Sequence, residues 1–215
     1  MIKGVIFDLD GVLVSTDEMH YKAWKRLAEE IGINNFTKED NIRQRGVSRM
    51  ESLEVLLSKG NRNYSPEEKG ELAERKNDYY KELLQTLDDS VLLPGAVEAL
   101  KKLKELNVMT AIGSASKNTP AILEKTGLAP YIDKVACGLD ITRSKPDPEV
   151  FQVAAEKLGL QYGECMVVED SAAGIQAAKS TEMRTLGVGP YYSELNADCK
   201  CRDLSCVKEW TEILR

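Results

Sequence analysis

Two aspartates one residue apart, Asp8 and Asp10, follow a short apolar stretch in the segment GVIFDLDGV. Residues two apart in an extended segment face the same side, so the two carboxylates are expected to lie close together and to oppose each other's ionisation. One carboxylate can attack a phosphoryl group and carry it as an acyl phosphate, while the other moves the proton of the leaving or entering hydroxyl. The spacing therefore indicates phosphoryl transfer, with Asp8 and Asp10 as candidate catalytic residues.

Polar residues also follow the later strands that the sequence predicts, at 113–116, 143–146 and 169–170. Ligands of open parallel sheets bind beyond the carboxyl ends of the strands, where these segments would converge. Buried like charges are costly unless a cation neutralises them, and oxygen ligands with room for phosphate favour Mg2+. The carboxylates are therefore candidate Mg2+ ligands, and one lysine and one serine are candidate phosphate-binding residues: Asp8, Asp10, Glu169, Asp170, Lys145 and Ser114.

Short apolar segments alternate with helical patterns through most of the chain. Strands are predicted at residues 2–7, 107–112, 132–137, 164–168 and 184–188, with helices at 95–106, 118–128, 148–159 and 172–180 between them. This alternation is typical of a parallel sheet covered by helices. We therefore expect an α/β fold with a Rossmann-like parallel sheet core and flanking helices.

The segment 16–87 lacks strand signals and contains three helix-start patterns. These are Ser15 with Glu18, Ser48 with Glu51, and the pair Ser65-Pro66 with Glu68, each with the spacing of a capping box. We expect a helical cap domain at residues 16–87, inserted after the first strand, and a catalytic core made from residues 1–15 and 88–215.

Composition limits the class of protein. The chain has 215 residues, 42% of them hydrophobic, which is enough for one or two compact domains. Its net charge of −6 argues against a nucleic-acid partner. No apolar run approaches the roughly 18 residues of a membrane span, and the first residues do not form a secretory signal. The five cysteines are an odd number and nothing points to export, so we expect reduced thiols. We also expect a cytoplasmic monomer that has no nucleic-acid or membrane partner.

The same residues have other possible uses. A calcium loop can also contain DxDG, but the acidic spacing of an EF-hand is missing here. The pair at 169–170 could simply be acidic residues at a helix start. Zinc binding by Cys199, Cys201 and Cys206 is disfavoured, because CxC-x4-C lacks the paired spacing of a structural site. The four polar segments together favour a catalytic site.

The segments DLDGV at 8–12, SAS at 114–116, SKPDP at 144–148 and EDSAAGI at 169–175 resemble the four motifs of the haloacid dehalogenase superfamily. Further segments at 16–20, 46–53, 73–80 and 114–118 resemble its sugar phosphomutases. The resemblance implies a cap after the first motif, Asp8 as nucleophile and Asp10 as acid/base. It also implies that Glu169 and Asp170 bind metal and that Lys145 and Ser114 bind phosphate. The further substrate-binding residues that it implies are Thr16, His20, Gly46, Arg49, Ser52, Lys76, Ala115, Lys117 and Asn118. Relatives commonly have Asp at position 15, where Ser15 can still cap the first helix.

Three cap residues have arguments of their own. His20 lies on the same helical stripe as Trp24, where it either joins the core or positions Asp10 or a sugar. Arg49 lies in a first helical turn, where a positive charge is unfavourable to the helix dipole unless an anion such as phosphate binds there. Lys76 interrupts an apolar seam, so it either extends to solvent or reaches a substrate.

Three functions remain open. A sugar phosphomutase would interconvert β-D-glucose 1-phosphate and D-glucose 6-phosphate through β-glucose 1,6-bisphosphate and an aspartyl-phosphate enzyme. A Mg2+-dependent phosphatase would release phosphate from a small sugar phosphate with the same Asp8 nucleophile. A module that binds metal and phosphate without turnover would not need the complete catalytic set. The sequence favours the phosphomutase.

Overall fold

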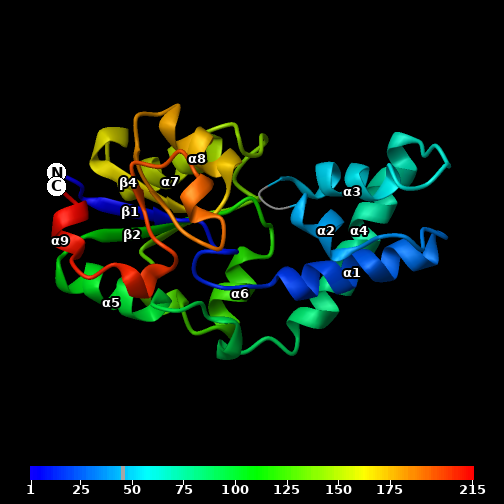
Figure 1. Cartoon of the computed structure of the whole chain (residues 1–215), viewed down its shortest axis with the longest axis horizontal. Coiled ribbons are helices and arrows are strands. Elements are labelled where there is room, and N and C mark those ends of the chain that lie inside the picture. Colours follow the sequence, from blue (N-terminus) through cyan, green and yellow to red (C-terminus); the bar gives the residue numbers. More distant parts are fainter. Residues whose placement is uncertain (45–46) are drawn as a thin grey trace. The chain divides into compact units, whose positions relative to one another are not determined.

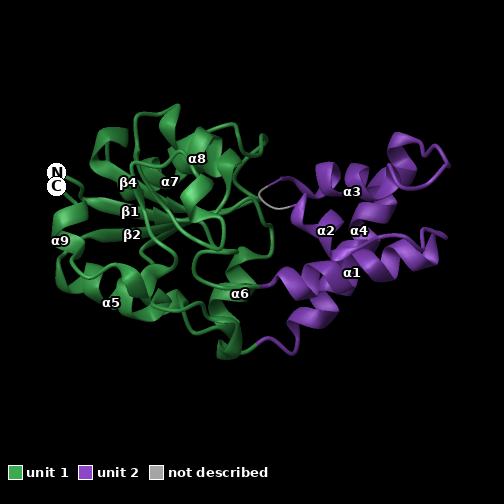
Figure 2. Ribbon diagram, viewed as in Figure 1, with its two compact units in different colours: residues 1–15, 88–215 green, residues 16–87 purple. Residues whose placement is uncertain are grey.

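The structure, a computed structural model, describes residues 1–44 and 47–215. The chain divides into two compact units, Met1–Ser15 with Asp88–Arg215, and Thr16–Leu87 (Figure 2). The second unit is inserted into the first shortly after its first strand. We call the first unit the core and the second the cap.

A parallel sheet of six strands forms the centre of the core (Figure 1). In spatial order the strands are β3 (Lys134–Ala136), β2 (Met109–Gly113), β1 (Gly4–Phe7), β4 (Cys165–Glu169), β5 (Arg184–Gly187) and β6 (Cys199–Lys200). The expected Rossmann-like sheet is confirmed. β1 begins at Gly4 rather than at residue 2, because the amides of Ile2 and Lys3 donate to Leu214 and Glu164 instead of to a neighbouring strand.

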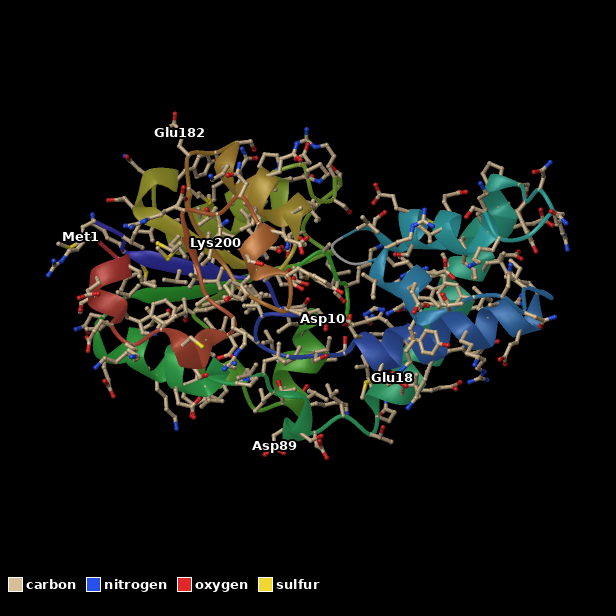
Figure 3. The ribbon with its side chains drawn as sticks, in the orientation of Figure 1. Met1, Asp10, Glu18, Asp89, Glu182 and Lys200 are labelled. Atoms are coloured by element: carbon tan, nitrogen blue, oxygen red, sulfur yellow. The ribbon has the colours of Figure 1, made fainter. Side chains whose placement is uncertain are left out.

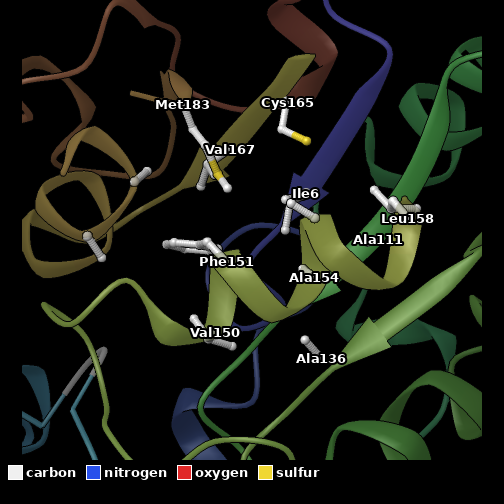
Figure 4. Close-up of a cluster of buried hydrophobic side chains, with 13 residues drawn as sticks. Ile6, Ala111, Ala136, Val150, Phe151, Ala154, Leu158, Cys165, Val167 and Met183 are labelled. Carbon is white, nitrogen blue, oxygen red and sulfur yellow. The ribbon is translucent and has the colours of Figure 1, made fainter. Parts of the chain in front are cut away.

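Helices cover both faces of the sheet, and Figure 1 shows α5 on the opposite side from α7 and α8. On one face, Ile6 of β1 and Val167 of β4 pack with Phe151 of α7 in a fully buried cluster (Figure 4). The α-helices of the core are α5 (Ala96–Glu105), α6 (Thr119–Lys125), α7 (Glu149–Leu158), α8 (Ala172–Lys179) and α9 (Trp210–Ile213). Its 3-10 helices are η1 (Asp89–Val91), η2 (Ala129–Tyr131), η3 (Tyr162–Glu164), η4 (Tyr192–Glu194) and η5 (Leu204–Cys206).

The described residues of the cap form helices joined by loops and contain no strand. Its helices are α1 (Asp17–Glu30), α2 (Lys38–Ile42), α3 (Arg49–Leu57) and α4 (Pro66–Leu84). Trp24 and Leu27 of α1 pack with Leu53 of α3 and Leu72 of α4 in a second buried cluster. The cap therefore has a hydrophobic core of its own. Across residues 1–44 and 47–215, the structure contains no helix long and apolar enough to span a membrane.

Two of the three predicted capping boxes, those that begin at Ser48 and Ser65, are confirmed. Ser48 Oγ accepts from the amide of Glu51 at 3.2 Å, and Ser65 Oγ accepts from the amide of Glu68 at 3.2 Å. The Ser15 capping box is wrong: Ser15 is exposed, and Thr16 is the N-cap residue of α1 without a side-chain capping bond. The Thr16 hydroxyl is instead hydrogen-bonded to the hydroxyl of Tyr80 at 2.9 Å, so tertiary packing replaces the local cap.

Candidate active site

Asp8 is the first residue after β1. Its backbone amide donates to the carbonyl oxygen of Val168 at 2.9 Å, and its side chain is nearly buried. Phe7 lies beside Ile112 of β2 and Val168 of β4 in parallel register. Because the strands are parallel, the loops that follow all three leave the sheet at one edge, and this edge carries the predicted catalytic segments.

Lys145 lies between two carboxylates at this edge. Its Nζ donates to Asp8 Oδ1 and to Glu169 Oε1, each at 2.6 Å. The ammonium group also lies 4.7 Å from the centre of the Phe151 ring, and the Lys145 side chain is only 2% exposed. The structure thus brings together three of the predicted residues in one buried ionic cluster.

The electrostatics of this cluster are dominated by burial. Burial raises the pKa of Asp8 to about 7, with Glu169 and Asp10 acting in the same direction, although Lys145 opposes the shift. Burial alone would lower the pKa of Lys145, but the neighbouring Asp8 and Glu169 raise it above its usual value. Lys145 therefore remains a cation, and the cluster carries more acidic than basic groups.

Glu169 and Asp170 lie where two glycines leave room for them. A Cβ atom on Gly174 of α8 would lie 2.0 Å from Glu169 Oε1, and one on Gly11 would lie 2.1 Å from Asp170 Oδ2. Gly11 also has a φ of +88°, a left-handed conformation that favours glycine. Asp10, labelled in Figure 3, precedes Gly11, so the loop of the two aspartates contacts the carboxylate of Asp170.

The donor chemistry of this edge suits a hard divalent cation. Carboxylate oxygens are what Mg2+ prefers in proteins, and the carboxylate of Asp170 touches the loop that carries Asp10. In the described part of the chain, however, no three or more His, Cys, Asp or Glu side chains are arranged to hold a metal, so the structure does not bring the four predicted ligands together as one group. Lys145 provides the positive charge between Asp8 and Glu169.

The loop after β2 contributes backbone and hydroxyl groups. Ser114 is buried, and its Oγ accepts from the amide of Ser116 at 3.2 Å. Ser116 Oγ in turn accepts from the amide of Asn118 at 3.2 Å, just before α6. Ala115 is half-buried and Lys117 is exposed. This loop follows the strand next to β1, as the sequence predicted for a phosphate-binding segment.

Inside the cap, a second buried lysine lies among aromatic groups. Lys76 Nζ is 2.8 Å from His20 Nδ1, 4.7 Å from the centre of the Trp24 ring and 4.8 Å from that of Tyr80. The His20 and Tyr80 rings are stacked, with centroids 4.1 Å apart. Burial, reinforced by the charges of Lys76 and Arg49, holds the pKa of His20 well below its usual range. His20 is therefore neutral beside a cation.

The remaining predicted cap residues lie on or near α3. Arg49 is the first residue of α3, and its Nη1 donates to Glu74 Oε1 of α4 at 2.6 Å. Ser52 is buried, and its carbonyl oxygen accepts from Gln44 Nε2 at 2.8 Å. Gly46 lies outside the described residues.

Sequence reasoning missed several residues that shape these clusters. Phe151 lies under the Lys145 ammonium group, and Tyr80 contacts Thr16, His20 and Lys76. Both belong to apolar helical stripes, so the pattern alone marks them as core residues. Gly174, four residues after Asp170, leaves room for the Glu169 carboxylate, and the glycine in the segment EDSAAGI is the sequence signal of this close approach.

Comparison with known proteins identifies the protein family. A model of the haloacid dehalogenase-like hydrolase family matches residues 2–181, so the chain belongs to this family. It is 40% identical to beta-phosphoglucomutase of Bacillus subtilis over 206 residues, which cover 95% of this chain and 91% of that protein. A crystal structure of beta-phosphoglucomutase from Clostridium difficile matches with a TM-score of 0.91 and 36% identity, covering 99% of this chain and 96% of that one.

A phosphatase is also among the relatives. The phosphorylated carbohydrates phosphatase of Thermotoga maritima is 32% identical over 182 residues, which cover 83% of this chain and 81% of that protein. Both kinds of activity therefore occur among proteins similar to this one.

Proposed function

We propose that this chain is a phosphomutase that interconverts β-D-glucose 1-phosphate and D-glucose 6-phosphate through β-glucose 1,6-bisphosphate. The observation that carries the proposal is the buried cluster of Asp8, Lys145 and Glu169 in a chain 40% identical to a beta-phosphoglucomutase. The chain is thus an enzyme of phosphoryl transfer, and its substrates are sugar phosphates.

In the proposed reaction, an Asp8 carboxylate oxygen attacks the phosphorus atom, and the bond from phosphorus to the donor oxygen breaks. Asp10 gives a proton to the leaving oxygen when the enzyme is phosphorylated and removes one from the sugar hydroxyl when the phosphoryl group is returned. Lys145 and Ser114 supply a positive charge and a hydroxyl donor for the oxygens of the transferring group. Asp8 must be ionised to attack, and the adjacent Lys145 favours that form.

We propose that Asp8, Asp10, Glu169 and Asp170 hold one Mg2+, which would offset negative charge on the transferring phosphoryl group. Activity should disappear when divalent ions are removed with a chelator and return when Mg2+ is added. Ca2+ should not substitute, because it takes a larger and looser shell of ligands. Full turnover in excess chelator would contradict this assignment.

The cap residues are proposed to bind the sugar and its second phosphate. Arg49 lies in the first turn of α3, where its guanidinium group, now paired with Glu74, and the positive end of the helix dipole together suit an anion. Lys76 is a second cation, and His20, Thr16 and Ser52 are further candidates, with Gly46, Ala115, Lys117 and Asn118 on the loops. A mutase needs this second phosphate-binding site because it must retain the sugar bisphosphate while the two phosphate groups of that intermediate exchange places.

The alternative is a phosphatase of small sugar phosphates, which the relative from Thermotoga maritima favours. Both reactions would use Asp8, so they are separated by product. 31P NMR of the purified enzyme with Mg2+, β-D-glucose 1-phosphate and a trace of bisphosphate decides between them. A mutase accumulates glucose 6-phosphate, whereas a phosphatase accumulates inorganic phosphate.

We also propose that the enzyme works as a cytoplasmic monomer without nucleic-acid or membrane partners. Its net charge of −6 supports the part of this proposal that concerns nucleic acid. Light scattering after size-exclusion chromatography measures the oligomeric state, and cell fractionation measures the location. A stable dimer, or recovery in a membrane fraction, would contradict the proposal.

A further inference from the structure

Three cysteines lie close together in sequence beyond β5, in the segment CKCRDLSC at 199–206. All three thiols are free, and their exposure differs: Cys206 is exposed, whereas Cys199 and Cys201 are partly buried. Lys200, labelled in Figure 3, separates the first two. The proposed reaction uses none of them.

Cys201 and Cys206 are gathered around one residue, Asp203. The Cys201 thiol lies 3.3 Å from the carbonyl oxygen of Asp203, and the amide of Cys206 donates to the same oxygen at 3.1 Å. The Cys206 sulfur is 3.6 Å from Asp203 Oδ1 and 4.0 Å from Arg202 Nη2. The exposed Cys206 sulfur thus lies between a carboxylate and a guanidinium group. The two thiols are thus neighbours across a tight turn.

We propose that Cys201 and Cys206 form a reversible thiol–disulfide modification site, in which Cys206 is the attacking thiol and Cys201 the resolving thiol. The reaction partner is a low-molecular-weight disulfide of the type RS–SR. The exposure of Cys206 allows such a molecule to reach it, whereas partial burial limits access to Cys201. Burial, with the nearby Cys206 and Asp203, also raises the pKa of Cys201 to about 11, so this thiol stays protonated until the second exchange.

The reaction balances in two exchanges. The Cys206 thiolate attacks one sulfur of RS–SR, which forms a mixed disulfide and releases RS−. Cys201 then loses its proton to solvent and attacks the Cys206 sulfur, which forms the internal disulfide and releases the second RS−. Two protein thiols are oxidised by two electrons in total, and RS–SR is reduced to two RSH.

The disulfide would act on the candidate active site through the backbone. The amide of Cys201 donates to the carbonyl oxygen of Gly187 at 3.0 Å, and the carbonyl oxygen of Arg202 accepts from the amide of Gly189 at 2.9 Å. Gly189 has a φ of +90°, and a Cβ atom on it would lie 3.1 Å from the Cβ of Asp170. Residues 201–202 therefore hold the segment that packs against Asp170.

The other end of the turn has little freedom to move. Leu204 is buried, and a Cβ atom on Gly95, at the N-terminus of α5, would lie 2.1 Å from the amide nitrogen of Ser205. Closure of a disulfide requires the two Cα atoms to come within about 7 Å of each other. Because Leu204 and Ser205 are tightly packed, any movement that closure requires would fall on residues 201–202 and would weaken the bond between Arg202 and Gly189.

The connectivity can be tested by peptide mapping of the full-length protein. After equilibration with oxidised glutathione, trypsin separates the three thiols into peptides 185–200, 201–202 and 203–208. We expect the oxidised protein to yield peptide 201–202 linked to 203–208, and dithiothreitol to release both. A link from Cys199 to either thiol, or no linked peptide at all, would overturn the site. This mapping does not depend on the proposed function.

The coupling to Asp170 has two readouts. Oxidation should speed hydrogen exchange at the Gly189 amide, whatever reaction the enzyme catalyses. It should also lower kcat/KM by about tenfold, since small displacements near reacting groups are costly. Cys199→Ser should respond like the wild type, whereas Cys206→Ser should keep full activity and slow exchange under the same treatment. Unchanged exchange at Gly189 in protein shown to carry the disulfide would overturn the coupling.

Discussion

Each unit of the chain buries one lysine, but the two lysines have opposite surroundings. Lys145 in the core lies 2.6 Å from each of two carboxylates. Inside the cap, Lys76 contacts the neutral imidazole of His20 and two aromatic rings. Burial lowers the pKa of His20, and the charges of Lys76 and Arg49 act in the same direction, so two cations lie close to this imidazole.

The difference indicates what each cluster is suited to bind. The core cluster has an excess of carboxylates, and a further cation there would relieve their mutual repulsion. In the cap cluster, Lys76 lies beside neutral groups, so a bound anion would be favourable there. A metal ion and a phosphate group are ligands of these two kinds, and a sugar bisphosphate reaction requires both.

The largest expected effect concerns the nucleophile of the core. Asp8→Asn should abolish turnover and phosphoenzyme formation, because an amide cannot replace the attacking carboxylate. The assays are steady-state kinetics and mass spectrometry of the intact protein after incubation with acetyl phosphate. The control is Asp89→Asn, which should behave like the wild type. Asp89, labelled in Figure 3, is an exposed residue of the same unit. A phosphorylated Asp8→Asn protein would show that another residue is the nucleophile.

The next prediction compares the two lysines directly. Lys145→Met leaves Asp8 and Glu169 buried without their cation and should lower the free energy of unfolding by about 3–5 kcal/mol. Lys76→Met keeps an apolar chain against Trp24 and Tyr80 and should change the free energy of unfolding by less than about 1.5 kcal/mol. Urea unfolding at neutral pH measures both. Equal losses would mean that the two clusters do not differ in the way described above.

Local patterns predicted the parts of these clusters that depend on local structure. Asp8 and Glu169 could be placed because each lies at the end of a buried parallel strand, and such ends share one edge of the sheet. The capping boxes at Ser48 and Ser65 could be predicted because they join residues three apart. The alternating strands and helices likewise predicted the class of fold, which the structure confirms.

Contacts between distant residues could not be predicted in this way. The hydroxyl of Thr16 meets that of Tyr80, and Arg49 pairs with Glu74, although local patterns link neither pair. The Ser15 cap was wrong because a local rule cannot account for such a tertiary hydrogen bond. His20 and Lys76 were both candidates, but their direct contact depends on how α1 packs against α4.

A smaller and more selective effect is expected in the cap. Arg49→Ala should lower mutase turnover by about ten- to a hundredfold, because charge-assisted bonds to a phosphate contribute about 1.5–3 kcal/mol. Phosphorylation of Asp8 by acetyl phosphate should remain nearly unchanged, since that donor has no second phosphate to hold.

Arg75→Ala is the matched control, since Arg75 also pairs with a glutamate, Glu30, at 2.6 Å within the cap. It should retain full mutase turnover. If Arg49→Ala slowed both reactions equally, the arginine would belong to the common phosphoryl site or to the fold. If it slowed neither, the phosphatase function would become the better supported one.

The smallest effect concerns the pH dependence of stability through His20. Its pKa is below the usual 6.5 in the folded chain, so between these two values the unfolded chain binds more protons than the folded one. The contribution of His20 to stability is therefore complete above about pH 6.5 and is lost as the pH falls toward the lowered value. Lys76→Met removes a repulsive charge and should raise the pKa of His20, whereas Arg75→Ala should not. The chain has one histidine, so NMR titration of a single imidazole signal measures this directly. If that signal titrates near pH 6.5 in the wild type, the cap cluster lacks the electropositive character that distinguishes it from the core.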